Sequence, residues 1–192
     1  MKKIKIVLGV AGASGSIYAK RIIEKLNAER LSPQVESAGL VFSSNAKDIW
    51  RQELGEFNES AFKMSTYHSK DFNAPFASGS AGFDVLIIAP CSMGVLGRIA
   101  SGVSSDLITR AADVMLKERK KLILLLREMP YSLVHLENMT KLTRAGAVIY
   151  PASPHFYHRP QTISELVDTV VNRVLETAGF DTGLKRWSGI EQ

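Results

Sequence analysis

The feature that most constrains the fold of this chain is an alternation of short apolar runs with longer amphipathic stretches. Runs rich in Val, Ile or Leu predict strands at residues 5–10, 34–42, 84–89, 121–126 and 147–150. Strands that alternate with helices are typical of a parallel sheet with helices on both faces. The sequence therefore predicts an α/β fold.

Length and composition favour one compact domain over residues 1–192. Of the 192 residues, 45% are hydrophobic and 22% are charged, which excludes a disordered or low-complexity protein. The lone cysteine, Cys91, excludes a disulfide framework and a cysteine-rich zinc site, and it favours a reducing, cytoplasmic location. The apolar run after Lys2 and Lys3 ends after about six residues, too short for a secretion signal or a membrane helix.

The charge balance is basic, with 24 Lys and Arg against 19 Asp and Glu and a net charge of +5. A basic chain can bind nucleic acid or small phosphorylated ligands. The positive residues form no single block, and the sequence has no nucleic-acid-binding motif. We therefore expect small anionic ligands and no nucleic acid.

Amphipathic periodicity and capping residues predict three helices in the second half of the chain. They span 106–120, 132–145 and 162–176. The first of them follows the candidate N-caps Ser104 and Ser105. The segment 55–79 has no regular pattern, so we expect a long loop or short excursions there; such a loop often carries function.

In an open parallel sheet, ligands bind beyond the carboxyl ends of the strands. The segments that follow the predicted strands are rich in Gly, Ser and polar residues: 9–16, 43–45, 90–94, 127–128 and 151–157. The first segment turns directly into a helix, so its N–H groups and Ser14 predict a phosphate site. The alternative is a tight turn that holds no ligand. Ser43 and Ser44 stand where an NAD enzyme has an acidic residue, which argues against NAD.

Several candidate residues keep two interpretations. Arg110 and Lys117 lie seven residues apart on one helix face, where they either meet a ligand or pair with Asp113 on a solvated surface. Arg173 is either a ligand contact or a solvent-exposed arginine. Cys91 is expected to be a buried thiol rather than a nucleophile.

A series of short motifs runs in order along nearly the whole chain. They are Gly12-Ala13-Ser14-Gly15, Ala77-Ser78-Gly79-Ser80, Pro90-Cys91-Ser92, Leu107 to Val114 with Lys117-Glu118-Arg119, Arg127-Glu128, His135 to Met139, Gly146-Ala147-Val148, and Pro151 to His158 with Pro160-Gln161. Each motif is weak alone, but the ordered set resembles the UbiX-type flavin prenyltransferases. Residues 55–69 match none of that family's motifs.

The resemblance implies a Rossmann-like, flavodoxin-related domain that forms a homo-oligomer, typically a dodecamer. Such proteins bind FMN and dimethylallyl phosphate, and they join the dimethylallyl group to N5 and C6 of the reduced flavin without a metal. The product, prenylated FMN, is the cofactor of UbiD-type decarboxylases, which act in ubiquinone biosynthesis or on aromatic acids.

The resemblance also implies site residues, position by position. FMN contacts are expected at Gly12, Ala13, Ser14, Ser43, Ser92, Met93, Gly94, Val95 and Arg127. Contacts with the prenyl phosphate are expected at Lys117, Tyr157 and Arg173. The catalytic positions fall on Glu53, Glu128, Arg110 and again Lys117. Phe72 stands at a substrate position where the family often has a tryptophan, which leaves the choice of prenyl donor open.

These assignments agree with the chemistry of the reaction. Cleavage of an allylic C–O bond develops positive charge on carbon and negative charge on phosphate. Cations therefore suit the phosphate, and an aromatic face such as that of Phe72 suits the carbon. We expect Glu128 to move a proton at the flavin, including deprotonation after attack at C6. Glu53 is either a second acid–base group or an electrostatic stabiliser.

Two other functions stay open at this point. An FMN-dependent cysteine-type decarboxylase shares the fold, but its Pro-Ala-Ser-Ala-Asn-Thr segment is replaced here by Pro90-Cys91-Ser92-Met93-Gly94, and no equivalent of its active-site His follows the first helix. A non-catalytic FMN carrier would bind FMN without consuming dimethylallyl phosphate.

Overall fold

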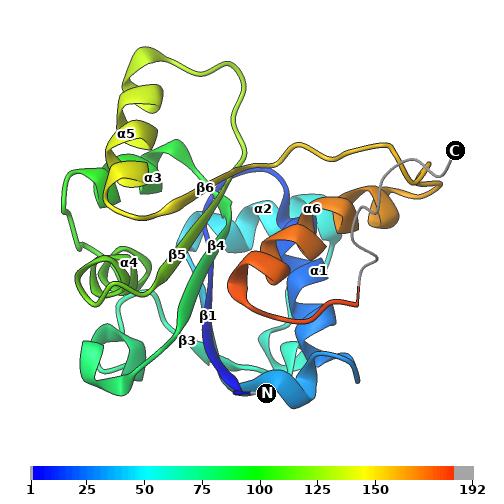
Figure 1. The fold of residues 1–192 in the computed structure, drawn as a ribbon, viewed down its shortest axis with the longest axis horizontal. Coiled ribbons are helices and arrows are strands. Elements are labelled where there is room, and N and C mark those ends of the chain that lie inside the picture. Colours follow the sequence, from blue (N-terminus) through cyan, green and yellow to red (C-terminus); the bar gives the residue numbers. More distant parts are fainter. Residues whose placement is uncertain (1, 184–192) are drawn as a thin grey trace, which may run out of the picture.

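The structure, a computed structural model, describes residues 2–183 and contains one parallel sheet (Figure 1). Its strands are β1 (Ile4–Val10), β2 (Val35–Phe42), β3 (Ser65–Tyr67), β4 (Val85–Cys91), β5 (Lys121–Leu126) and β6 (Val148–Pro151). The strand order is β3-β2-β1-β4-β5-β6, and every pairing is parallel.

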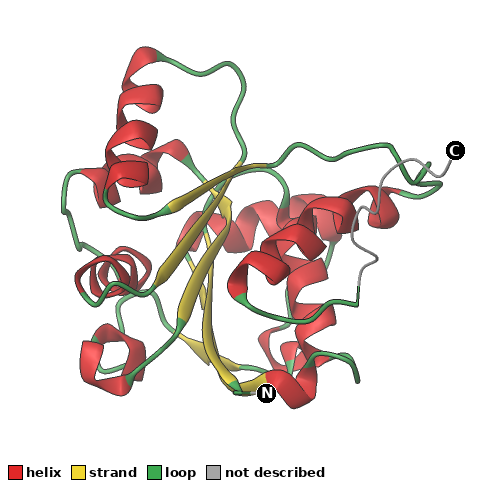
Figure 2. Ribbon diagram, viewed as in Figure 1, coloured by secondary structure: helices red, strands yellow, loops and turns green. Residues whose placement is uncertain are grey.

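Helices cover both faces of this sheet (Figure 2). They are α1 (Ser16–Asn27), α2 (Ser44–Leu54), α3 (Met93–Ala100), α4 (Leu107–Lys117), α5 (Leu133–Arg144) and α6 (Ile163–Ala178). One hydrophobic cluster joins α1, α2 and α6 to one face, and a second joins α3, α4 and α5 to the other. The predicted α/β fold of the flavodoxin-like kind is confirmed.

The core forms because the central strands are apolar on both sides. All seven residues of β4 are buried, and so are the last five residues of β1. Parallel strands that are covered on both faces need such continuous apolar runs. Trp50 of α2 packs edge-on against Phe42 in one cluster, while Met115 of α4 is buried in the other. Among the described residues, no helix has both the length and the apolar character needed to span a membrane.

The structure refines one expectation about local structure and corrects another. β3 lies within 55–79, the segment expected to be a long loop or short excursions; it is a three-residue strand that pairs with β2 at the sheet edge. Such a short, partly exposed strand needs no apolar run. The N-cap of α4 is Asp106 rather than Ser104 or Ser105, and its side chain accepts a hydrogen bond of 2.9 Å from Thr109 N. A carboxylate one residue closer to the helix takes the capping position.

The strand order reverses at the centre of the sheet. From β1 the chain passes outward to β2 and β3, and it then returns to β4 on the other side of β1. In parallel sheets the crevice for ligands lies outside the carboxyl ends of the strands at this reversal. The topology therefore predicts a ligand crevice beside the turns that follow β1 and β4.

Candidate functional site

The residues expected to contact FMN follow four neighbouring strands, β2, β1, β4 and β5, whose carboxyl ends lie at one edge. Backbone hydrogen bonds of 3.0 to 3.4 Å hold these ends together, and they join Ser43 to Val10, Ala11 to Pro90, and Arg127 to Cys91. The edge therefore collects nine residues that we call the strand-end group: Gly12, Ala13, Ser14, Ser43, Ser92, Met93, Gly94, Val95 and Arg127.

Gly12 allows the turn after β1 to approach α2 closely. A Cβ built on Gly12 would lie 2.7 Å from the Cβ of Asn45, which is closer than such atoms come in real structures. Ser14 lies exposed further along this turn, and its carbonyl accepts a hydrogen bond of 3.0 Å from Arg127 Nε. The guanidinium at the end of β5 thus reaches past β4 to the turn after β1.

The amino terminus of α1 is bonded to the carboxylate of Glu53, which lies in the last turn of α2. Both carboxylate oxygens accept from Gly15 N at 3.0 Å, and Oε2 also accepts from Ser16 N at 2.7 Å. Gly15 has a φ of 108°, in the left-handed region that favours glycine. The N–H groups expected to bind a phosphate are here bonded to a carboxylate of the protein itself, since a helix amino terminus attracts any anion.

This placement keeps Glu53 ionised. Burial raises the pKa of the Glu53 carboxyl, but hydrogen bonds from Ser14, Gly15 and Ser16 outweigh burial, and the resulting pKa lies below its usual value. A carboxyl group with a lowered pKa does not donate a proton near neutral pH. Of the two roles left open by the sequence, the environment of Glu53 favours that of an electrostatic stabiliser.

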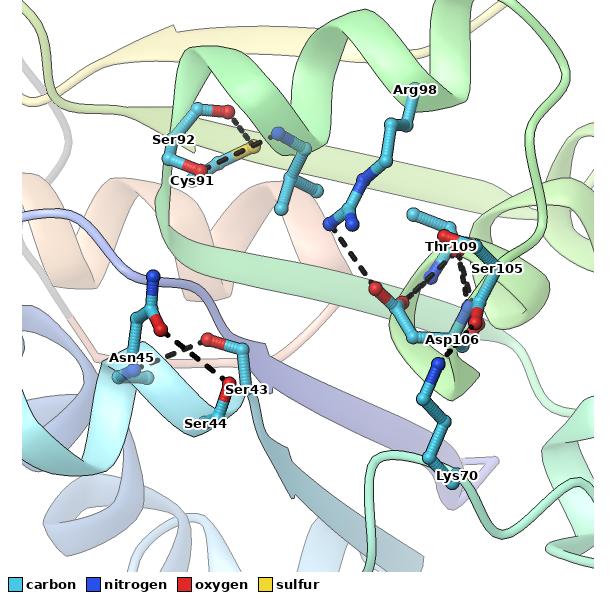
Figure 3. Close-up of polar contacts among 12 residues, drawn as sticks. Ser43, Ser44, Asn45, Lys70, Cys91, Ser92, Arg98, Ser105, Asp106 and Thr109 are labelled. Carbon is cyan, nitrogen blue, oxygen red and sulfur yellow. Dashed lines mark hydrogen bonds and ion pairs between the residues drawn. The ribbon is translucent and has the colours of Figure 1, made fainter.

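Two further helix amino termini open at the same edge. The Ser43 hydroxyl accepts a hydrogen bond of 3.2 Å from Ala46 N and caps α2, and the Ser92 hydroxyl accepts one of 3.4 Å from Val95 N and caps α3. Figure 3 shows Ser43 and Ser92, which stand directly before α2 and α3. A Cβ built on Gly94, in the first turn of α3, would have no described atom within 4 Å. The backbone of this turn is therefore open to a ligand.

A polar group that sequence reasoning missed lies beside α3. Arg98 binds Asp106 at 3.1 Å, and Lys70 Nζ donates to Ser105 O at 2.9 Å (Figure 3). These contacts hold the segment around Lys70 and the start of α4 against α3. Lys70 and Ser105 are 35 residues apart, so no local spacing reveals their contact. The sequence does contain one signal for this group: Asp106, a residue type common at helix N-caps, directly precedes the amphipathic pattern of α4.

Glu128 and Cys91 flank the strand-end group. Glu128 is half-buried, and its Oε1 accepts a hydrogen bond of 2.9 Å from Met129 N. Cys91 is fully buried, and burial raises its pKa to about 12. This confirms the expected buried thiol, because the thiolate is the nucleophilic form. Among the described residues, no group of three or more His, Cys, Asp or Glu side chains is placed to hold a metal ion.

Arg110 and Lys117 are both engaged within the chain. Arg110 Nε donates to Ala77 O at 3.1 Å, and its Nη1 binds Asp113 at 3.3 Å. Lys117 binds Glu118, the C-cap residue of α4. The alternative in which Asp113 pairs with both cations is therefore right for Arg110 and wrong for Lys117. The reason is that another carboxylate directly follows Lys117 at the helix end.

The three expected contacts of the prenyl phosphate do not meet within one chain. Lys117 ends α4, while Arg173 lies on α6 at the opposite face of the sheet (Figure 1). Tyr157 is 84% exposed in the segment after β6, and Phe72 is 47% exposed. Lys117 also precedes the start of β5, whereas Arg127 follows the end of that strand. A single copy of the chain thus assembles the strand-end group and does not assemble a donor-phosphate site.

Comparison with known proteins identifies the family of this chain. The Flavoprotein family matches residues 1–175. The flavin prenyltransferase UbiX of Methanocaldococcus jannaschii is 43% identical over 190 residues, which cover 97% of this chain and 100% of the relative.

Two solved structures are also similar over almost the full length. The crystal structure of AnUbiX (PadA1) in complex with FMN and dimethylallyl pyrophosphate has a TM-score of 0.89 and 39% identity, and the match covers 99% of this chain and 100% of that one. A dodecameric FMN-dependent UbiX-like decarboxylase from Escherichia coli O157:H7 has a TM-score of 0.89 and 38% identity, with coverage of 97% and 100%. The chain therefore belongs to the Flavoprotein family and, within it, to the UbiX-type flavin prenyltransferases.

Proposed function

We propose that this chain joins the dimethylallyl group of dimethylallyl phosphate to N5 and C6 of reduced FMN, and that its product, prenylated FMN, is used by a UbiD-type decarboxylase. The observation that carries this function is the strand-end group, in which Ser14, Ser92 and Arg127 meet at one edge of the sheet. A cysteine-type decarboxylase is not favoured, because relatives matched over nearly their full length are flavin prenyltransferases by name.

The chemistry of the strand-end group fits FMN. The hydroxyl of Ser43 and the open first turn of α3 offer hydrogen-bond donors, and Arg127 offers positive charge for a phosphate. Met93 and Val95 are buried in the hydrophobic cluster at the same edge, where they anchor the first turn of α3 to the sheet. When bound, the reduced flavin supplies the nucleophilic positions N5 and C6. The chain's own residues then hold this ring and control charge and protons around it.

The two carboxylates beside this group are proposed to have different tasks. Glu53 is held ionised on the amino terminus of α1, so it presents a fixed negative charge. Such a charge stabilises the positive charge that develops on the allylic carbon as the phosphate leaves. Glu128 directly follows Arg127, and we assign it the proton that is lost from C6 after the new carbon–carbon bond forms.

The donor phosphate is proposed to bind between copies of the chain. Lys117 and Arg173 lie on opposite faces of the sheet, so one phosphate does not reach both within a single copy. The UbiX-like relative from Escherichia coli is dodecameric. In a homo-oligomer of this kind, a cation of one copy can face the strand-end group of another. We therefore propose an oligomer, and expect a dodecamer, as the active form.

Anaerobic incubation of the purified chain with reduced FMN and dimethylallyl phosphate tests this function. We expect the flavin to gain one C5H8 unit by mass spectrometry, with release of inorganic phosphate. A parallel incubation with inorganic phosphate in place of the donor is expected to leave the flavin mass unchanged. A chain that binds FMN but never changes its mass in the presence of the donor would be a flavin carrier, and the proposal would be refuted.

A further inference from the structure

The segment 68–72 lies at the same edge of the sheet as the strand-end group. β3 pairs in parallel with β2, and Tyr67 at the end of β3 lies opposite Val41 near the end of β2. Ser43 follows β2 and the segment 68–72 follows β3, so both leave the sheet at its carboxyl edge. Phe72, expected as a contact of the prenyl donor, therefore belongs to a segment that starts at the edge proposed to hold the flavin.

The ring of Phe72 is not fixed by its own packing. Its exposed fraction is 47%, and it belongs to neither hydrophobic cluster of the described chain. The backbone of Phe72 forms a tight turn, in which its N–H donates a hydrogen bond of 3.1 Å to Lys70 O. The position of the ring therefore depends on the contacts that hold this turn.

Hydrogen bonds tie this turn to the start of α4. Leu107 N donates to Ser69 O at 2.8 Å. Lys70 Nζ donates to Ser105 O at 2.9 Å. The first bond joins two backbone groups, whereas the second depends on one exposed side chain that lies two residues before Phe72. Substitution of Lys70 therefore loosens the turn without touching Phe72 itself.

The start of α4 is in turn held against α3. Asp106 Oδ1 accepts a hydrogen bond of 2.9 Å from Thr109 N, and its Oδ2 binds Arg98 Nη2 at 3.1 Å (Figure 3). Arg98 belongs to α3, the helix whose open first turn is proposed to contact the flavin. The turn that carries Phe72 and the helix proposed to bind the flavin thus share one support.

We propose that Lys70 is a positioning residue that holds the ring of Phe72 beside the allylic carbon of the donor. This inference rests on the proposed function and on Phe72 as a donor contact. The attraction between a cation and an aromatic ring requires that the charge lie over the ring face, within about 6 Å of its centre. The allylic carbon gains positive charge only as its bond to the phosphate breaks. A displaced ring therefore slows this step and leaves binding of the donor unchanged.

The test compares Lys70→Met with Lys70→Arg in the full chain, with reduced FMN and dimethylallyl phosphate under anaerobic conditions. Methionine keeps an unbranched apolar side chain but does not donate to Ser105 O, whereas arginine keeps a charged donor. We expect Lys70→Met to lower kcat by about threefold to tenfold, with the KM for the donor and the affinity for FMN unchanged. Lys70→Arg should restore most of the lost kcat.

A double-mutant cycle with Phe72→Ala shows whether Lys70 acts through the ring. Phe72→Ala alone should lower kcat at least as much as Lys70→Met does, and Lys70→Met should cause no further loss in the Phe72→Ala chain. A role of Lys70 in general stability would instead produce the same loss in both chains. That result, or a Phe72→Ala chain with the kcat of the parent, would overturn the inference and leave the proposed function standing.

Lys2→Met is the matched control, because Lys2 Nζ binds Asp84 at 2.9 Å beside the amino-terminal ends of β1 and β4. This substitution removes the same charge and a contact of the same length at the opposite edge of the sheet, so it should keep the kcat of the parent chain. If Lys70→Met costs no more than Lys2→Met, the inference is wrong. If the parent chain forms no flavin adduct, the proposed function fails and this inference fails with it.

Discussion

Glu53 connects α2 to the amino terminus of α1, and its replacement tests whether negative charge makes this connection. The carboxylate accepts hydrogen bonds from the backbone N–H groups of Gly15 and Ser16. We expect Glu53→Gln to lower the free energy of unfolding and to slow flavin prenylation. The amide keeps one acceptor oxygen but loses the attraction between a negative charge and the positive end of the helix.

The magnitude can be worked from these contacts. A negative charge at a helix amino terminus contributes about 0.3–1 kcal/mol. A hydrogen bond to a charged group contributes about 1.5–3 kcal/mol, against about 0.5–1.5 kcal/mol for a neutral pair. Because Glu53 is exposed, solvent screening brings the expected loss to about 1 kcal/mol. In a chain of this length, that loss lowers the Tm by about 2–4 °C.

The pH dependence identifies the charge as the cause. Folding lowers the pKa of Glu53, so its contribution to stability is fully present above the unfolded pKa, about 4.3 for a glutamate. This contribution is lost as the pH falls through the lower pKa of the folded state. The stability difference between the parent chain and Glu53→Gln should therefore be constant near neutral pH and shrink below about pH 4. Urea unfolding followed by tryptophan fluorescence measures this difference.

Glu137→Gln provides the control, since Glu137 is exposed on α5 and lies far along the chain from α1. This substitution should leave stability unchanged at every pH. Our reasoning about Glu53 is refuted if its replacement costs no more than the control at neutral pH. A stability difference that grows as the pH falls would refute it as well, because that sign belongs to a group whose pKa is raised by folding.

Three other changes have definite expected outcomes. Glu128→Gln should slow formation of the flavin adduct by about 10²-fold or more and leave FMN binding, followed by flavin fluorescence, unchanged; equal turnover would remove Glu128 from the mechanism. Gly39→Ala would place a Cβ 2.6 Å from the ring of Phe76, so thermal unfolding should show a loss of about 1–3 kcal/mol, and an unaltered Tm would mean that the ring moves without cost. Burial raises the pKa of Cys91 to about 12, so a disulfide reagent should label its thiol slowly in the native chain and rapidly in urea; fast native labelling would contradict its burial.

The sheet could be predicted wherever its strands are buried on both faces. β5 lies at Lys121–Leu126, the predicted range, and each end of β1 and β4 lies within two residues of its predicted position. Such strands need continuous apolar sequences, so composition alone reveals them. β3 could not be predicted, because its three residues form an edge strand that pairs on one side only in the described sheet.

The site was predictable only in part, for geometric reasons. Parallel strands end at one edge, so the approach of Ser14 to Arg127 follows from the fold class. The bond from Gly15 to Glu53 joins residues 38 positions apart and leaves no local pattern. The resemblance names Lys117 as a phosphate contact, yet motif identity does not tell which copy of the chain supplies it.

The separation of Lys117 and Arg173 on opposite faces of the sheet has a genetic consequence. A chain that lacks the lysine and a chain that lacks the arginine each retain the group that the other has lost. Mixed assemblies of Lys117→Ala and Arg173→Ala chains should then include some intact sites. Two alleles whose products are each inactive alone would therefore restore growth or activity when they are expressed together. Such interallelic complementation does not occur in an enzyme in which one polypeptide supplies every functional group of each site.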